Sequence, residues 1–303
     1  MAHPDNAFYG HNRLLAEYAG FGASPPPIRG HIQHGWSEAN GLSLKPRLVS
    51  WLPKLVWNDV NRKAAHEAGI DPIEVIGAPF CYYDRISALA PPGPRSTIYY
   101  PFHGWERDDI LGSHHELVAA IADHEDGPVT VCLYWREFDQ PAVRQVYMDA
   151  GFRVVCHGYR GDPHFTIRQR EELLRHDRIA SNRAATAIWY GGYLGRAMEV
   201  YGPLFSIVGA DEAARYDRYQ RSRWPELFGG GMEAEASREL AAYELGDGFV
   251  LEPGELKELL GWTPRALRRA PLVKAASHAE HHARRIGYNI ALRLPRSEPL
   301  PRF

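Results

Sequence analysis

VTVCLYWREFDQPAVRQVYMDAGFRVVCH, residues 129–157, is the stretch that decides the fold. Its first six residues, 129–134, are uncharged and include β-branched side chains, which predicts a buried strand. A helix is predicted over 141–150, where Gly151 ends it, and a second buried strand over 153–157. Two buried strands joined by a single helix indicate a parallel β-α-β unit.

The same alternation continues on both sides of this unit. Further strands are predicted at 28–33, 54–57, 73–76, 96–102, 178–181 and 197–201, and further helices at 12–18, 61–68, 113–124, 165–174 and 183–194. Three prolines, Pro91, Pro92 and Pro94, interrupt the alternation and predict a domain boundary. We therefore expect an α/β fold with two Rossmann-like domains, residues 1–90 and 95–230, and a helical C-terminal extension over 231–303.

Composition narrows the class of protein. The 303 residues are 45% hydrophobic and carry a formal charge of −2, which is typical of a globular chain. The three cysteines lie far apart in apolar stretches, so core thiols in a reducing compartment are expected. No basic and apolar leader is seen at the start, and no window approaches the roughly 18 apolar residues of a membrane span.

Charge is distributed unevenly along the chain. Residues 261–303 contain nine Lys or Arg and two Glu, whereas the remainder has an excess of acidic side chains that makes a poor nucleic-acid surface. The basic residues of 261–303 alternate with apolar ones at helical spacing. This pattern fits a helix on an anionic membrane surface and equally a helix packed on the body with its basic side in water.

Polar side chains follow the predicted strands of the second domain. His103 and Glu106 come after strand 96–102, and Tyr159 and Arg160 come after strand 153–157. Because the carboxyl ends of parallel strands meet at one edge of the sheet, these side chains are expected to form a nucleotide pocket.

The end of strand 178–181 is the most informative. Ser181 or Asn182 is suited to cap the next helix, and the small residues that follow would leave its first backbone amides open to a phosphate. In the first domain, His34, Gly35 and Trp36 directly follow strand 28–33 and precede Glu38, the same order as His103 to Glu106.

Several other chemistries lack their motifs. The chain has no GxxxxGK[ST], GxGxxG, GxSxG or HExxH sequence. The pair at His114 and the group that begins at His278 have no acidic or cysteine partner at metal-binding spacing, so no metal site is expected.

Two of these segments resemble known sequences. Residues 32–36 and 179–195 are similar to motifs of bacterial surface-polysaccharide transferases, a group that includes polysialyltransferase-like enzymes and the glycerophosphotransferases of wall teichoic acid synthesis. The resemblance implies the GT-B architecture, in which two Rossmann-like domains face a central cleft. It makes His34 the candidate base and places Ser181, Asn182 and Thr186 on the donor phosphate. His103 matches a position where such families often carry His-Pro, but Gly104 stands in place of the proline.

We therefore expect an inverting, metal-independent glycosyltransferase without a cofactor, which moves a sugar from a nucleotide-sugar donor to a hydroxyl of a surface or secreted glycan or glycolipid. His34, or alternatively Glu38, would take the acceptor proton. His103 with the amides at Ser181 and Asn182 would neutralise the departing phosphate. Tyr159, Arg160 and Glu106 would hold the base or ribose. The expected location is cytoplasmic, at the inner face of the membrane if residues 261–303 bind lipid. A nucleotide-sugar epimerase and a noncatalytic nucleotide- or glycan-binding protein remain alternatives.

Overall fold

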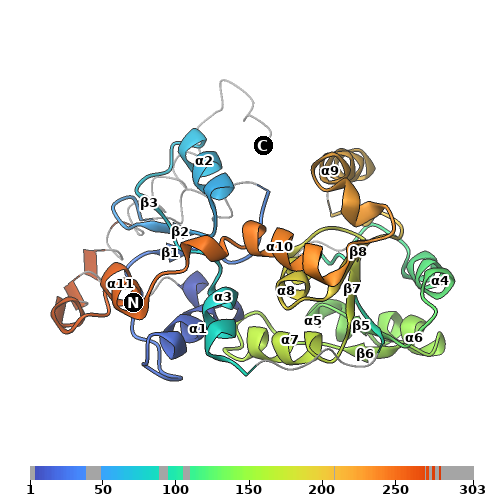
Figure 1. The fold of residues 1–303 in the computed structure, drawn as a ribbon, viewed down its shortest axis with the longest axis horizontal. Helices are drawn as coiled ribbons and strands as arrows, with labels where there is room; N and C mark the ends of the chain where they lie inside the picture. The colour runs from blue at the N-terminus through green and yellow to red at the C-terminus, as the bar shows by residue number, and fades with distance from the viewer. Residues whose placement is uncertain are drawn as a thin grey trace, which may run out of the picture.

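The computed structural model describes residues 4–38, 49–88, 95–104, 110–207, 209–269, 271–272, 275–276 and 280. Two separate parallel sheets form within this part of the chain (Figure 1). The first has three strands in the order β1 (His31–Ile32), β2 (Lys54–Val56) and β3 (Ile73–Val75). This confirms the α/β class with parallel sheets.

The second sheet has five strands in the order β6-β5-β4-β7-β8. Their bounds are β4 Thr97–Tyr100, β5 Val129–Cys132, β6 Arg153–Val155, β7 Arg178–Ser181 and β8 Ala197–Val200. Every pairing is parallel. Because the chain adds strands on one side of β4 and then on the other, the carboxyl ends of β4 and β7 form the switch point where such sheets bind ligands.

Helices cover both faces of the second sheet (Figure 1). On one face, Tyr99 of β4 packs with apolar residues of α4 (His114–His124) and α6 (Pro141–Asp149). On the other face, Ile98 packs with α7 (Phe165–Leu173), α8 (Thr186–Tyr193) and α10 (Ala234–Glu244). The short helices α5 (Trp135–Phe138) and η3 (Pro225–Phe228) and the longer α9 (Ala210–Arg223) complete this unit.

The first sheet is surrounded by η1 (Pro4–Gly10), α1 (His11–Tyr18), α2 (Asp59–Glu67) and α3 (Pro79–Ile86). The chain then returns to this unit at its end, since Leu256 and Leu260 of α11 (Pro253–Leu260) share a core with Leu15, Ile32 and Leu55. Glu280 also lies against the first unit, because its carboxylate accepts hydrogen bonds from the backbone N–H and hydroxyl of Ser50. Most of the basic segment 261–303 and the predicted boundary at 89–94 lie outside the described residues.

The two units share one apolar core. Trp57, which follows β2, and Phe80 of α3 belong to the same buried cluster as Trp189 and Tyr190 of α8. The rings of Phe80 and Tyr190 stack with their centroids 4.0 Å apart. This packing joins α3 of the first unit to α8 of the second, so α8 contacts both units.

The sequence pattern predicted most elements and misplaced one that matters for the site. Helix α8 begins at Thr186 and not at Arg183. The Ser181 hydroxyl accepts the Arg183 N–H, and the Gln220 side chain accepts the Ala184 N–H, so these amides are bonded before the helix begins. Helices α3 and α9 were not predicted.

Gly246 provides a test of the packing between the units. It has φ +68°, and a Cβ built there would lie 1.9 Å from the carbonyl oxygen of Trp57. We expect Gly246→Ala to lower the free energy of unfolding by about 3 kcal/mol, because both the left-handed backbone and the contact disfavour a side chain. Gly248, two residues away, has no heavy atom within 4 Å of such a Cβ. Gly248→Ala is the matched control, and equal urea denaturation midpoints for the two variants would contradict this account.

No described helix combines the length and apolar character that crossing a membrane requires.

Candidate functional site

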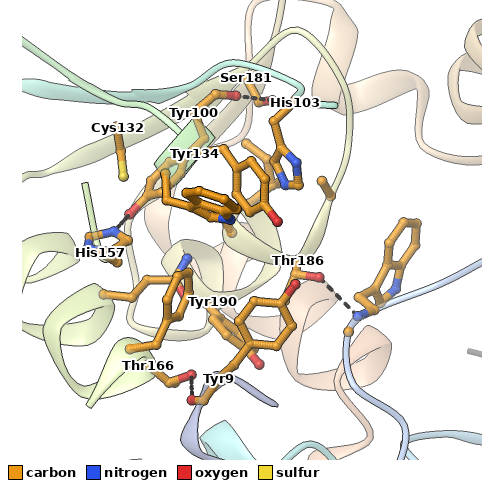
Figure 2. Close-up of a pocket in the computed structure, with 18 of the residues that line it drawn as sticks. Tyr9, Tyr100, His103, Cys132, Tyr134, His157, Thr166, Ser181, Thr186 and Tyr190 are labelled. Carbon is orange, nitrogen blue, oxygen red and sulfur yellow. Dashed lines mark hydrogen bonds between the residues drawn. The ribbon is translucent and has the colours of Figure 1, made fainter. Parts of the chain in front are cut away.

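A cavity of about 270 Å³ lies between the two units (Figure 2). The second unit lines it with the segments that follow β4, β5, β6 and β7 and with the beginning of α8. The first unit contributes residues of η1, the start of α1, and the turn after β1. The cavity therefore occupies the switch point of the five-stranded sheet, where the sequence predicts ligand binding.

The turn that carries His34 is fixed by hydrogen bonds on both sides. Gln33 donates from Nε2 to the Gly35 carbonyl at 2.9 Å. The Trp36 N–H donates to the Thr186 hydroxyl at 3.0 Å, and its indole N–H donates to the Glu244 carboxylate at 3.1 Å. His34 lines the cavity between these anchors, so α8 and α10 of the second unit set the position of a side chain from the first.

The N-terminus of α8 forms the opposite wall. Ala185 is the N-cap, with φ −146° and ψ 176°, and its side chain makes no capping hydrogen bond. Thr186, Ala187 and Ile188 of the first turn line the cavity. Backbone amides at the beginning of a helix have no partner within the helix and carry the positive end of its dipole. This wall is thus suited to an anionic group such as a phosphate.

The two residues at the end of β7 have different roles. Ser181 lines the cavity, and its hydroxyl donates to the Tyr100 carbonyl at 2.6 Å. Asn182 lies outside the cavity lining; its side chain accepts the Phe102 N–H at 2.7 Å and donates to the Pro203 carbonyl at 2.9 Å. Asn182 therefore ties the ends of neighbouring strands together.

His103 lines the cavity beside Tyr134, with the two rings stacked 4.2 Å apart. Its Nδ1 lies 2.7 Å from the Gly104 carbonyl oxygen, which can only accept, so Nδ1 carries the proton of that bond. Burial lowers the pKa of His103, and in the neutral ring Nε2 is left as an acceptor.

The other predicted site residues lie apart from this cavity. The Glu38 carboxylate accepts a hydrogen bond from the Gln220 side chain, and burial raises its pKa. Tyr159 is 49% exposed, and the Arg160 guanidinium lies 4.3 Å from the centre of the Phe8 ring. Glu106 lies outside the described residues. The structure thus brings together His34, His103, Ser181 and Thr186.

His11, His157 and Tyr190 also line the cavity and were not predicted as site residues from the sequence. Burial lowers the pKa of His11 to about 3 and that of His157 to about 4. His157 lies 2.9 Å from the Tyr100 hydroxyl, and Tyr190 comes from the second turn of α8. His157 is the last residue of predicted strand 153–157, much as His103 directly follows strand 96–102, and this position could have identified it. His11 is the first residue of α1 and does not follow a predicted strand, so no such position marks it.

Within the described residues, no group of three or more His, Cys, Asp or Glu side chains is suited to hold a metal ion. His114 instead has its Nδ1 2.7 Å from the Tyr147 hydroxyl, and its neighbour His115 is exposed. The three histidines of the group that begins at His278 lie outside the described residues.

Comparison with known proteins gave structural matches alone. No family model and no curated protein sequence matches the chain. Among solved structures, it is similar to Medicago truncatula UGT71G1 complexed with UDP-glucose, at 12% identity over 76% of this chain and 54% of that one, with a TM-score of 0.32. It is also similar to Phytolacca americana UGT2 complexed with UDP-2fluoro-glucose and pterostilbene, at 11% identity over 78% of this chain and 60% of that one, with a TM-score of 0.31.

A third similar structure is the wall teichoic acid polymerase TagF, at 10% identity over 78% of this chain and 58% of that one, with a TM-score of 0.29. The chain spans 54 to 60% of the length of these three structures. These matches are GT-B glycosyltransferases, the architecture that the sequence resemblance implies.

Proposed function

We propose that this chain is a glycosyltransferase that moves a sugar from a nucleotide-activated donor to a hydroxyl group of a surface or secreted glycan or glycolipid. The observation that carries the proposal is the cavity between two parallel-sheet units, with the uncapped N-terminus of α8 on one wall and His34 on another. A phosphate site and a candidate base in one cavity are what the transfer of a phosphate-activated group requires.

Each wall has a role in this proposal. The amides of Thr186 and Ala187 bind the donor phosphates and stabilise the charge that develops as the nucleotide departs, whereas the Ile188 N–H already donates to the Ala185 carbonyl at 3.0 Å. His34 takes the proton of the acceptor hydroxyl, which then attacks the anomeric carbon from the side opposite the leaving phosphate, so the anomeric configuration is inverted. Glu38 is the weaker alternative as base, because Gln220 already binds its carboxylate and it does not line the cavity.

The donor assay measures nucleotide release from UDP-, GDP-, dTDP- and CMP-sugars, with and without glycan acceptors. We expect one donor to release nucleotide only when an acceptor is present, and EDTA to leave the rate within about twofold, because helix amides in place of a metal stabilise the phosphate in this proposal. Conversion of the donor to another nucleotide-sugar without acceptor would favour an epimerase. Binding without any release would favour a noncatalytic protein.

The proposal includes contact between residues 261–303 and anionic lipid headgroups, for which the basic residues of that segment are the support. Co-sedimentation with phosphatidylglycerol vesicles tests it.

A further inference from the structure

Three buried polar atoms in the cavity lining have no hydrogen-bond partner among the described residues: Nε1 of Trp135, Nδ1 of His11 and the hydroxyl of Tyr190. His11 and Tyr190 are the two most buried of these residues, each 1% exposed. A buried polar atom without a hydrogen bond costs about 1–3 kcal/mol, so such atoms call for a ligand or an ordered water. His11 comes from α1 of the first unit and Tyr190 from α8 of the second.

The two side chains are neighbours in space. Both contact the ring of Trp57, with centroid distances of 5.9 Å for His11 and 6.3 Å for Tyr190. Tyr9 also lies beside His11, with its ring centre 5.8 Å from that of His11. Figure 2 shows Tyr190 and Tyr9 together at one end of the cavity.

The protonation state of His11 defines what it can bind. Burial and the neighbouring His34 lower its pKa to about 3, so the ring is neutral at physiological pH. The ring also makes a hydrogen bond with the backbone of Gln33. This bond raises the pKa of His11, so the imidazole is the donor and the Gln33 backbone is the acceptor. Because Nδ1 is the nitrogen without a partner, the donor is Nε2, and Nδ1 presents a lone pair. With this pKa His11 is too weak a base to remove a hydroxyl proton efficiently, and it acts instead as a hydrogen-bond acceptor.

Tyr190 complements this acceptor. Burial raises the pKa of its hydroxyl far above the usual value, so the group keeps its proton and can donate. Stacking on Phe80 holds the ring in place. A sugar hydroxyl donates one hydrogen bond and accepts others, which suits this pair, whereas a carboxylate could only accept and would face the lone pair of His11.

The walls beside the pair are aromatic, with Tyr9, Trp36 and Phe165 in the lining. Such rings pack against the C–H face of a pyranose. We propose that His11 and Tyr190 bind hydroxyl groups of an uncharged sugar at the reaction centre, which makes them specificity-determining residues for a neutral glycosyl group. This inference rests on the proposed glycosyltransferase function and names its substrate class.

The test compares nucleotides with their sugar conjugates by isothermal titration calorimetry on the full chain. The probe pairs are UDP with UDP-glucose, GDP with GDP-mannose, dTDP with dTDP-glucose, and CMP with CMP-N-acetylneuraminic acid. We expect a neutral conjugate to bind more tightly than its free nucleotide. Tyr190→Phe and His11→Leu should each weaken the conjugate about tenfold and change the affinity of the free nucleotide less than twofold. His11→Asn, which keeps an acceptor near Nδ1, should restore most of the loss.

The control is Tyr193→Phe, one turn further along α8, whose hydroxyl donates to Asp247 at 2.7 Å outside the cavity lining. It should leave both affinities unchanged. Three results would overturn the inference and leave the transferase proposal standing. The variants could lose affinity equally for the conjugate and the free nucleotide, Tyr190→Phe could lose no affinity, or the unmodified chain could prefer CMP-N-acetylneuraminic acid. Failure of the unmodified chain to bind any nucleotide would overturn both.

Discussion

His34→Ala is expected to lower kcat/KM of sugar transfer about 10³-fold, the middle of the range for loss of a general base. His34 lies in the cavity on a turn whose anchors are Trp36, Thr186 and Glu244, none of which depends on the imidazole. The fold should therefore survive the substitution, and the affinity for the donor nucleotide should change little. The measurement is initial rate against donor and acceptor concentration, with thermal melting as a check on folding.

Two companion variants make that result specific. Glu38→Gln should keep activity within a few-fold, because the amide can still bond to Gln220 and no proton is taken by that side chain. His115→Ala changes an exposed histidine and should have no effect. Full activity in His34→Ala would show that His34 is not the base. A loss of activity in Glu38→Gln larger than that in His34→Ala would point to Glu38 as the base.

Acidification is expected to destabilise the chain strongly between pH 6.5 and pH 5. Burial lowers the pKa of His11 to about 3 and that of His157 to about 4, against 6.5 for an ordinary histidine. The unfolded chain therefore binds two protons in this window that the folded chain does not, and the free energy of unfolding falls by roughly 1.4 kcal/mol per histidine per pH unit. The loss is about 4 kcal/mol at pH 5 for the two together.

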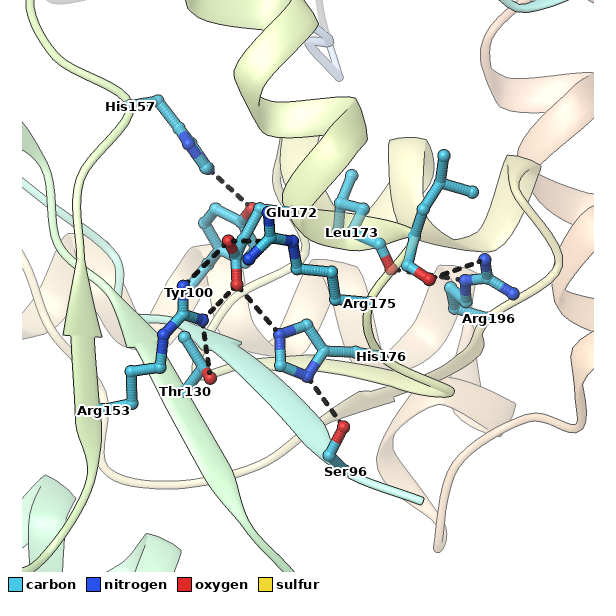
Figure 3. A network of polar contacts seen from close by, with 11 residues as sticks. Ser96, Tyr100, Thr130, Arg153, His157, Glu172, Leu173, Arg175, His176 and Arg196 are labelled. Atoms are coloured by element: carbon cyan, nitrogen blue, oxygen red, sulfur yellow. Dashed lines mark hydrogen bonds and ion pairs between the residues drawn. The ribbon is translucent and has the colours of Figure 1, made fainter. Parts of the chain in front are cut away.

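Two buried carboxylates act in the opposite direction at the lower end of this window. Burial raises the pKa of Glu38 and of Glu244, so protonating them in the folded chain offsets part of the loss. Glu172 does not: burial, which raises its pKa, is outweighed by hydrogen bonds from His176 and Arg153 that lower it, so its protonation adds to the loss below pH 5 (Figure 3).

The test therefore compares slopes from urea denaturation at pH 7, 6 and 5. His11→Asn and His157→Asn should each reduce the fall by about 2 kcal/mol, and exposed His115→Asn should not. If the free energy of unfolding falls as much in both cavity variants as in the unmodified chain, neither histidine is held neutral in the folded state.

The two sheets could be predicted from the sequence because their strands are short apolar runs separated by single amphipathic helices. Strand β7 was predicted with its observed bounds, and the ends of β4 to β7 do form the cavity. His34, His103, Ser181 and Thr186 converge there because each follows or lies near the carboxyl end of a parallel strand, a relation that strand direction alone determines.

The rest depends on contacts between distant segments, which a single sequence does not reveal. His11 enters the cavity because Tyr9 and Thr166 join η1 to α7 through a hydrogen bond of 2.7 Å, and nothing near residue 11 predicts that pairing. The amide side chain of Asn182 could bind a phosphate, but in the structure it is hydrogen-bonded to the backbone of Phe102 and Pro203. Likewise, the delayed start of α8 depends on Gln220, 36 residues away from Ala184.

The central claim is that a nucleotide binds with its phosphates on the first turn of α8, and Ala185→Asp tests it most directly. An aspartate at this N-cap would accept the N–H groups of Ala187 or Ile188, raise stability by about 1 kcal/mol, and place a negative charge where the phosphate binds. The measurement is thermal melting of the unmodified chain and of Ala185→Asp with CMP, CDP, UDP, GDP and dTDP. The account predicts that at least one nucleotide stabilises the unmodified chain, and that Ala185→Asp melts higher without ligand yet does not respond to that nucleotide. An equal response in both proteins, or none in the unmodified chain, would contradict it.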